Sequence, residues 1–270
     1  MSYNNIADMD CAWECVKSFN KTACVIVKHA NPCAVSLGEN AKDAYKLAFA
    51  SDKISAFGGI IAFNTLVDGV LMDFIINQCF IEVLIAPDFS LDALNIVSKK
   101  PNIRVIKIPS NIYYKDIEVK SLNNGGLLLQ TYNNMDVIQE QLQVVSNKLP
   151  TEDQMQDLIF LFKVAKFSKS NAIVVGKDGT TYGIGSGQTS RIDSVSMAIR
   201  KAQQAGLNLD GSCCASDAFF PFRDGVDIIA KNGIKAIIHP GGSIRDNEVI
   251  ESANENDIVM VTTKLRHFKH

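Results

Sequence analysis

Lys235-Ala236-Ile237-Ile238-His239-Pro240-Gly241-Gly242 is the stretch that decides the fold class, because an apolar run of strand length ends in a glycine-rich turn. Residues 225–232 before it predict a helix that Gly233 closes. A second helix is predicted to begin near Asp246, and residues 257–262 predict the next strand. Strand, helix and strand in this order predict a right-handed β-α-β unit with parallel strands.

The same alternation extends toward the N-terminus. Residues 23–27 and 60–63 predict strands, and residues 10–19 and 40–50 predict helices. The chain is therefore predicted to have an α/β layered fold.

Residues 144–153 predict a linker, because Pro150 is followed by an acidic helix start led by Thr151. We place a boundary there and expect two domains, residues 1–147 and 148–270, each of ordinary single-domain size. The sequences of the two halves contain no clear repeat.

The composition indicates a chain that folds without disulfides or a structural metal, since 47% of its 270 residues are hydrophobic and 21% are charged. Basic and acidic residues are interleaved at a net charge of -2, which excludes the basic surface typical of nucleic-acid binding. No apolar run approaches the ~20 residues of a membrane span, and the N-terminus lacks the pattern of a secretory signal. We therefore expect a cytoplasmic protein without nucleic-acid or membrane partners.

The 7 cysteines lie mostly in apolar stretches, as reduced thiols do in cytosolic proteins. No Cys-x-x-Cys pair occurs, and the 4 histidines are scattered along the chain. The sequence therefore predicts no metal site.

An apolar strand ends abruptly in the polar cluster Lys28-His29-Ala30-Asn31-Pro32-Cys33. Open α/β sheets bind ligands at the carboxyl ends of strands, where a histidine supplies a base and a lysine supplies a charge. Taken alone, Lys28 and His29 are better explained as solvated residues at a strand end. A second segment, Ser55-Ala56-Phe57-Gly58-Gly59, fits either an ordinary turn or the close approach of a flat ligand to the backbone.

A third cluster begins at Lys169-Ser170-Asn171-Ala172 and continues through a predicted hairpin turn at Asp178-Gly179. The alternating glycines of residues 183–187 lack the spacing of a dinucleotide fingerprint, so no nucleotide cofactor is expected. The segment ends at Arg191, where a helix N-terminus would cradle an anion.

Two further clusters have ordinary explanations when taken alone. The segment Ser216-Asp217-Ala218-Phe219-Phe220-Pro221-Phe222-Arg223-Asp224 suits core packing, or a heteroaromatic ligand held by rings and an acid. The C-terminal Leu265-Arg266-His267-Phe268-Lys269-His270 has the composition of a frayed basic tail.

Together, these clusters resemble the aminoimidazole-carboxamide ribonucleotide (AICAR) formyltransferase domain of the bifunctional purine-biosynthesis enzyme that also carries inosine-monophosphate (IMP) cyclohydrolase. The resemblance extends from residue 2 to residue 270 and is most specific at residues 28–33, 55–59, 169–172 and 216–224. It implies an enzyme of IMP biosynthesis that transfers a formyl group from the cosubstrate 10-formyltetrahydrofolate to the 5-amino group of AICAR.

The resemblance also implies two tandem cytidine-deaminase-like α/β/α subdomains in a homodimer with shared active sites. Deaminases of that superfamily hold zinc through His-x-Glu and Pro-Cys-x-x-Cys. Here Ala30 and Asn31 follow His29, and Pro32-Cys33 precedes Ala34-Val35-Ser36, so the zinc ligands are missing and a zinc-free site is expected.

Three catalytic roles follow from the resemblance. His29 is expected to accept the proton of the attacking amine. Asn171 is expected to donate a hydrogen bond to the oxyanion of the tetrahedral intermediate. Lys28 is expected to stabilise developing charge and to assist departure of the folate nitrogen.

Substrate-binding roles are implied in the same way. Asp224 matches an acid that engages the pterin ring. The loop containing Ser55, Gly58 and Gly59 is expected to form a wall of the folate pocket. Nucleotide binding is assigned to Asn5, Arg191, Phe219 and, from the partner chain, Arg266 and Phe268.

The family's Arg-Tyr-Gly phosphate-binding segment and its cyclohydrolase domain are not part of this sequence. Two interpretations therefore stand. The chain is either an active formyltransferase beside a separate IMP cyclohydrolase domain, or a catalytically impaired, dimer-forming fragment that needs a separate N-terminal chain.

Overall fold

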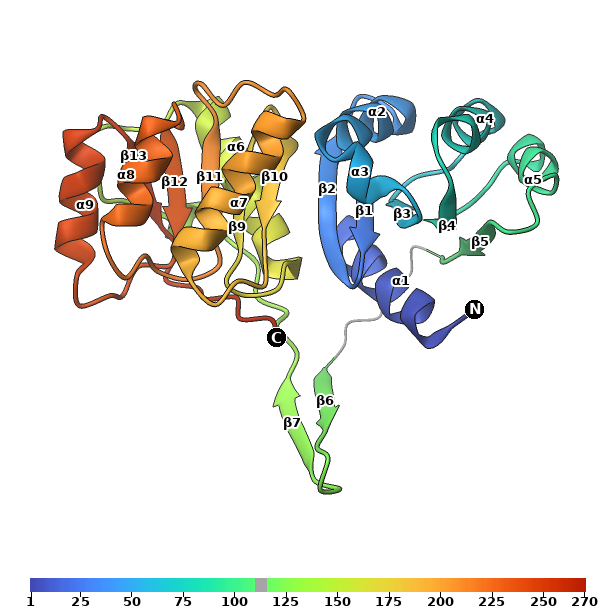
Figure 1. The fold of residues 1–270 in the computed structure, drawn as a ribbon, viewed down its shortest axis with the longest axis horizontal. Helices are drawn as coiled ribbons and strands as arrows, with labels where there is room; N and C mark the ends of the chain where they lie inside the picture. The colour runs from blue at the N-terminus through green and yellow to red at the C-terminus, as the bar shows by residue number, and fades with distance from the viewer. Residues whose placement is uncertain (110–115) are drawn as a thin grey trace.

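The computed structural model describes residues 1–109 and 116–270. As predicted, the fold is α/β. It is built on one mixed sheet of 11 strands in the order β5-β4-β3-β1-β2-β10-β9-β11-β12-β13-β8. Figure 1 shows the N-terminal strands at one end of this sheet and the C-terminal strands at the other.

The N-terminal half combines an antiparallel hairpin with parallel strands. In it, β1 pairs antiparallel with β2 and β3, whereas β3, β4 and β5 run parallel. Its strands are β1 (Ala23–Lys28), β2 (Asn31–Leu37), β3 (Gly59–Phe63), β4 (Ile81–Ala86) and β5 (Arg104–Lys107). Its helices are α1 (Tyr3–Val16), α2 (Ala41–Ser51), α3 (Lys53–Ala56), α4 (Gly69–Gln78) and α5 (Leu91–Val97).

Side-chain caps explain where these helices begin. Asn40 caps α2 by accepting a hydrogen bond from the backbone N–H of Asp43, as the predicted helix start requires. The helix expected at residues 10–19 begins earlier, at Tyr3, because Ser2 and Asn5 form a capping box.

The C-terminal half repeats the same arrangement. Here β9 pairs antiparallel with β10 and β11, whereas β11, β12 and β13 run parallel. Its strands are β9 (Ile173–Lys177), β10 (Thr180–Gly185), β11 (Cys213–Ser216), β12 (Ala236–His239) and β13 (Val259–Thr262). Its helices are α6 (Glu152–Phe167), α7 (Arg191–Gln204), α8 (Asp224–Lys231) and α9 (Asp246–Glu255).

Three predictions for this half are confirmed. The β-α-β unit is β12, α9 and β13, with parallel strands. Thr151 caps α6 through a capping box. The turn between β9 and β10 places Asp178 and Gly179 in the left-handed region, at φ of 51° and 65°.

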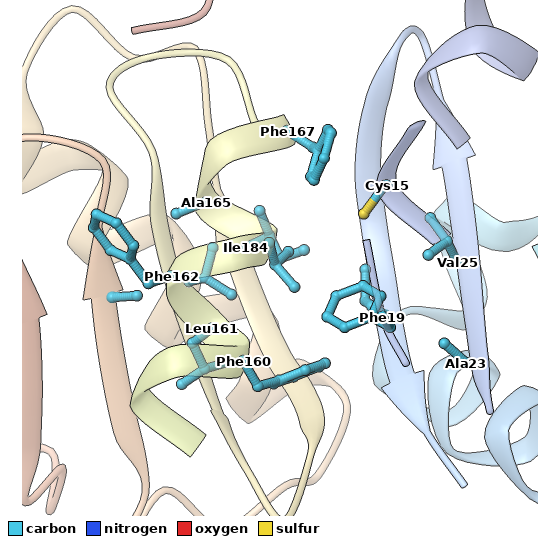
Figure 2. Packing of buried hydrophobic residues seen from close by; sticks show 14 of the residues in the cluster. Cys15, Phe19, Ala23, Val25, Phe160, Leu161, Phe162, Ala165, Phe167 and Ile184 are labelled. Carbon is cyan, nitrogen blue, oxygen red and sulfur yellow. The ribbon is translucent and has the colours of Figure 1, made fainter. Parts of the chain in front are cut away.

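The two halves meet at the junction of β2 and β10. Ser36 and Thr180 are paired across it, and their hydroxyl oxygens lie 2.7 Å apart. A hydrophobic cluster covers the junction, where the rings of Phe19 and Phe160 approach to 5.5 Å between centroids (Figure 2). Both the sheet and this hydrophobic cluster extend through the two halves. The domain boundary at residue 147 stays a prediction.

A hairpin of β6 (Ile117–Ser121) and β7 (Leu127–Thr131) projects away from the sheet (Figure 1). Every residue of both strands is exposed. After a short 3-10 helix, η1 (Gln139–Gln141), the strand β8 (Gln143–Val144) pairs with β13 at the edge of the sheet. Across the described part of the chain, no helix is long and apolar enough to cross a membrane.

Candidate active site

A cavity of about 430 Å³ lies at the starts of α7 and α8 and beside the C-terminal tail. It gathers side chains that are far apart in the sequence. The predicted site residues that line it are Asn171, Arg191, Phe219, Asp224 and Phe268.

A buried ion pair organises one wall of this cavity. The Arg191 guanidinium donates to the carboxylate of Asp217 at 2.6 Å and to the hydroxyl of Ser216 at 2.7 Å. Arg191 is 9% exposed and Asp217 is 0% exposed. A charge buried this deeply needs its partner, so each of the two residues holds the other in place.

The same network orients Asn171. Its side-chain oxygen accepts a hydrogen bond from Arg191 at 2.8 Å. Its amide nitrogen therefore points the other way and donates to the carbonyls of Gln188 at 3.0 Å and Thr189 at 3.3 Å. To donate to a bound oxyanion, this amide must exchange one of the two carbonyls for the ligand.

The C-terminal tail is ordered and not frayed. The backbone N–H of His267 donates to the carbonyl of Asp217 at 3.0 Å, and Lys269 reaches the carbonyl of Phe167 at 3.0 Å. Burial lowers the pKa of His267 to about 4. The tail places Phe268 against the cavity of its own chain.

Arg266 does not line this cavity. It lines a neighbouring one of about 460 Å³, and Phe219 belongs to both. The Arg266 guanidinium also lies 5.7 Å from the centre of the Phe268 ring. The predicted cation is therefore close to the aromatic side chains expected to bind the nucleotide.

Lys28 and His29 form a second group in the N-terminal half. The structure replaces the expected open strand end by a two-residue turn between β1 and β2, with His29 at φ 56° and Ala30 at φ 53°. Lys28 donates from Nζ to the carbonyl of Phe57 at 2.6 Å, which ties it to the loop of Ser55, Gly58 and Gly59. His29 is exposed.

One hydrogen bond joins the two groups across the halves. The side-chain oxygen of Asn31, two residues after His29, accepts from the backbone N–H of Lys169 at 2.8 Å. Lys169 is itself two residues before Asn171. Lys28 and His29 nevertheless do not line the cavity of about 430 Å³.

Asn5 lies apart from both groups. It is 8% exposed, and its amide donates to Glu82 at 2.6 Å while its oxygen accepts from the N–H of Ser2 at 3.2 Å. In this chain, the amide oxygen caps the start of α1, and the amide nitrogen ties that start to Glu82 of β4.

Asp8 and Asp217 are the residues that sequence reasoning missed. Asp8 accepts from the backbone N–H groups of His29 and Ala30, at 3.2 and 2.7 Å. The only sequence indication of Asp217 was an acid beginning a run of aromatic residues, whereas Asp8 gave none.

No set of three or more His, Cys, Asp or Glu side chains is close enough to hold a metal ion in residues 1–109 and 116–270. Cys33, which follows Lys28 and His29 in the sequence, is not an activated thiol, because burial raises its pKa to about 12. The zinc-free site stays a prediction.

Comparison with known proteins identifies close relatives. The family profile described as the AICARFT/IMPCHase bienzyme matches residues 1–201. The bifunctional purine biosynthesis proteins PurH of Neisseria gonorrhoeae (strain NCCP11945) and Xanthomonas axonopodis pv. citri (strain 306) are 57% and 52% identical over 270 residues. That alignment covers 100% of this chain and 51% of each relative, so the chain spans about half their length.

A solved deaminase/reductase of Thermotoga maritima, named for diaminohydroxyphosphoribosylaminopyrimidine, is a much weaker match. It covers 40% of this chain and 34% of its own at 22% identity, with a TM-score of 0.29. A likeness this slight supports no conclusion about the fold.

Proposed function

Because this chain belongs to the AICARFT/IMPCHase bienzyme family, we propose that it transfers a formyl group from 10-formyltetrahydrofolate to the 5-amino group of AICAR, giving FAICAR. This step belongs to IMP biosynthesis in the cytoplasm. We propose that IMP cyclohydrolase, the family's second activity, resides in a separate domain. The comparisons offer no support for the alternative of a catalytically impaired fragment.

The observation that carries this proposal is the cavity of about 430 Å³, which brings together Asn171, Arg191, Phe219, Asp224 and Phe268 from separate parts of the chain. Its volume is within the range of about 300–1,000 Å³ typical of small-molecule sites. The aromatic rings and the half-buried Asn171 amide that line this cavity suit a flat heteroaromatic substrate with polar edges.

The proposed reaction assigns one proton transfer to each residue of the N-terminal group. The 5-amino nitrogen of AICAR attacks the formyl carbon, and His29 accepts the proton that this nitrogen loses. The carbon–N10 bond of the folate then breaks, and Lys28 gives a proton to the departing nitrogen. His29 then releases its proton to solvent water, and Lys28 takes one proton from solvent water, so both residues return to their starting forms.

Asn171 is proposed to stabilise the negative oxygen of the tetrahedral intermediate. Arg191 already fixes the orientation of the Asn171 side chain, so donation to a ligand requires only that the amide exchange one of its two carbonyl partners. Preorganised donors of this kind are worth about 10²–10³ in rate. Asp224, also on the cavity wall, is proposed to bind the amino-pyrimidine edge of the pterin.

The two halves are proposed to be tandem cytidine-deaminase-like units without zinc. Their shared strand order supports this, because each half has a hairpin followed by three parallel strands. The helices also correspond. One helix precedes each hairpin, and others connect the parallel strands.

A homodimer with shared active sites is proposed from the hairpin of β6 and β7. An isolated two-stranded hairpin is marginally stable in water. This hairpin exposes apolar side chains, among them Leu127 at 62% and Leu129 at 67%. We propose that a second copy of the chain covers this hairpin and supplies its own Lys28 and His29 to the cavity.

The test is a formyl-transfer assay on the purified chain with AICAR and 10-formyltetrahydrofolate. We expect turnover, and we expect His29→Ala to reduce it by about 10²-fold or more while the melting temperature stays unchanged, since His29 is exposed. Turnover in the variant equal to that of the original chain would refute the role of His29. No turnover in a folded, dimeric original chain would refute the proposed function.

A further inference from the structure

Asp8 holds the backbone of the turn that carries His29. Its carboxylate oxygens accept from the backbone N–H groups of His29 at 3.2 Å and Ala30 at 2.7 Å. One helical turn further along α1, the thiol of Cys11 donates to the carbonyl of Ala30 at 3.3 Å. One face of α1 therefore binds two N–H groups and one carbonyl of this turn.

The C-terminal half contains an equivalent carboxylate. Asp157, on the corresponding helix α6, accepts from the backbone N–H groups of Asp178 at 2.9 Å and Gly179 at 2.8 Å. These two residues form the turn between β9 and β10. A helix carboxylate that binds both N–H groups of a hairpin turn is therefore a feature of both halves.

The two turns differ in what they require. Asp-Gly adopts the left-handed conformation at little cost, because glycine has no Cβ. His29 and Ala30 both adopt it, at φ 56° and 53°, without a glycine. Such a conformation persists in non-glycine residues when surrounding contacts enforce it, and functional sites are where it concentrates.

We propose that Asp8 is a positioning residue for formyl transfer, which holds His29 in the left-handed turn where its imidazole meets the attacking amine. This inference rests on the proposed function of His29. The carboxylate acts through the backbone and does not touch the substrate.

The test compares Asp8→Asn with Asp157→Asn, which removes the equivalent carboxylate from a turn that contains glycine. Asparagine offers one accepting oxygen where the carboxylate offers two, so one N–H of each turn loses its partner. Hydrogen exchange at His29 and Ala30, measured by mass spectrometry, reports the turn without reference to activity. Assays of kcat and of KM for AICAR report the reaction.

For Asp8→Asn we expect exchange at His29 and Ala30 to accelerate and kcat to fall on the order of tenfold, with KM for AICAR within about twofold. Asp157→Asn is expected to accelerate exchange at its own turn and to leave kcat unchanged. Adding Ala30→Gly to Asp8→Asn is expected to recover much of the lost kcat, because glycine needs no carboxylate to stay left-handed.

Unchanged exchange at His29 and Ala30 in Asp8→Asn would overturn the role of Asp8 in the turn. Faster exchange with an unchanged kcat would overturn its role in positioning. An inactive original chain whose exchange still depends on Asp8 would overturn the proposed function and leave the contact of Asp8 with the turn confirmed.

Discussion

At the scale of single residues, two carboxylates in or near the candidate cavity have different tasks. Asp217 is buried and bonded to Arg191, Ser170 and the N–H of Ala172. Asp224 lines the cavity and accepts only a local bond, from the N–H of Gly225 at 2.7 Å, among those described. The first carboxylate is structural support for Asn171, and the second is available to a ligand.

This difference predicts opposite effects for two similar substitutions. Asp217→Asn leaves the Arg191 charge buried without a counter-charge, so we expect the free energy of unfolding to fall by about 3–5 kcal/mol. Asp224→Asn should leave it within about 0.5 kcal/mol and raise KM for the folate. Urea denaturation and steady-state kinetics check both, and equal stabilities of the two variants would contradict this assignment.

The sequence identified the residues of the cavity only through a family resemblance, and it missed the residues that support them. Asp8 and Asp217 act through contacts with chain segments far away in sequence, so no local pattern reveals them. Arg191 is expected to bind the nucleotide, but its guanidinium also donates hydrogen bonds to Asn171 and Asp217. That second use depends on tertiary packing.

At the scale of elements, the glycines of β10 serve helix packing. A Cβ on Gly183 would lie 2.0 Å from the carbonyl oxygen of Ala198, and one on Gly185 would lie 2.0 Å from that of Ser194. Both carbonyls belong to α7, which therefore lies directly against the strand. This explains the alternating glycines without a nucleotide cofactor.

Gly183→Ala is therefore expected to lower the free energy of unfolding by about 1–3 kcal/mol or more, because backbone on both sides must shift. Gly126→Ala is the matched control. Its Cβ would meet side-chain atoms at 3.3 Å on the exposed hairpin. If the two variants unfold at the same urea concentration, the claim that Gly183 is required for the close packing of α7 on β10 is wrong.

The two buried histidines His239 and His267 should make the free energy of unfolding depend on pH. Burial lowers the pKa of His239 and of His267 to about 4 in each case, from a usual value of 6.5. Between these values the unfolded chain binds protons that the folded chain does not. Acidification from pH 7 to pH 4 should therefore reduce stability by on the order of 3 kcal/mol for each histidine.

His239→Gln isolates one of the two contributions, since glutamine does not titrate. The difference in unfolding free energy between pH 7 and pH 4 should be smaller in this variant than in the original chain. An equal pH dependence in both would show that folding does not lower the pKa of His239.

The element types were largely predictable, whereas their arrangement was not. Hydrophobic periodicity located β12 and β13 closely, and the acid Asp246 marked the start of α9. The two halves share one topology but no recognisable sequence repeat, because unrelated side chains occupy equivalent positions. The pairing of the two halves of the sheet at Ser36 and Thr180 likewise depends on contacts between distant residues.

At the scale of the whole molecule, the proposed dimer predicts complementation between inactive variants. If Lys28 and Arg266 serve one site from different subunits, mixed dimers of Lys28→Ala and Arg266→Ala contain one intact site. Refolding the two variants together should then restore roughly a quarter of the original activity, assuming random pairing. Mixed dimers that stay inactive would place both residues in the same subunit's site.

The cavity of about 430 Å³ is proposed to bind AICAR, and calorimetric titration of AICAR into the purified chain tests this most directly. We predict saturable binding of one AICAR per chain, weakened at least tenfold in Phe219→Ala because the ring that contacts the heteroaromatic base is removed. No binding to the folded original chain, or equal affinity in Phe219→Ala, would contradict the claim.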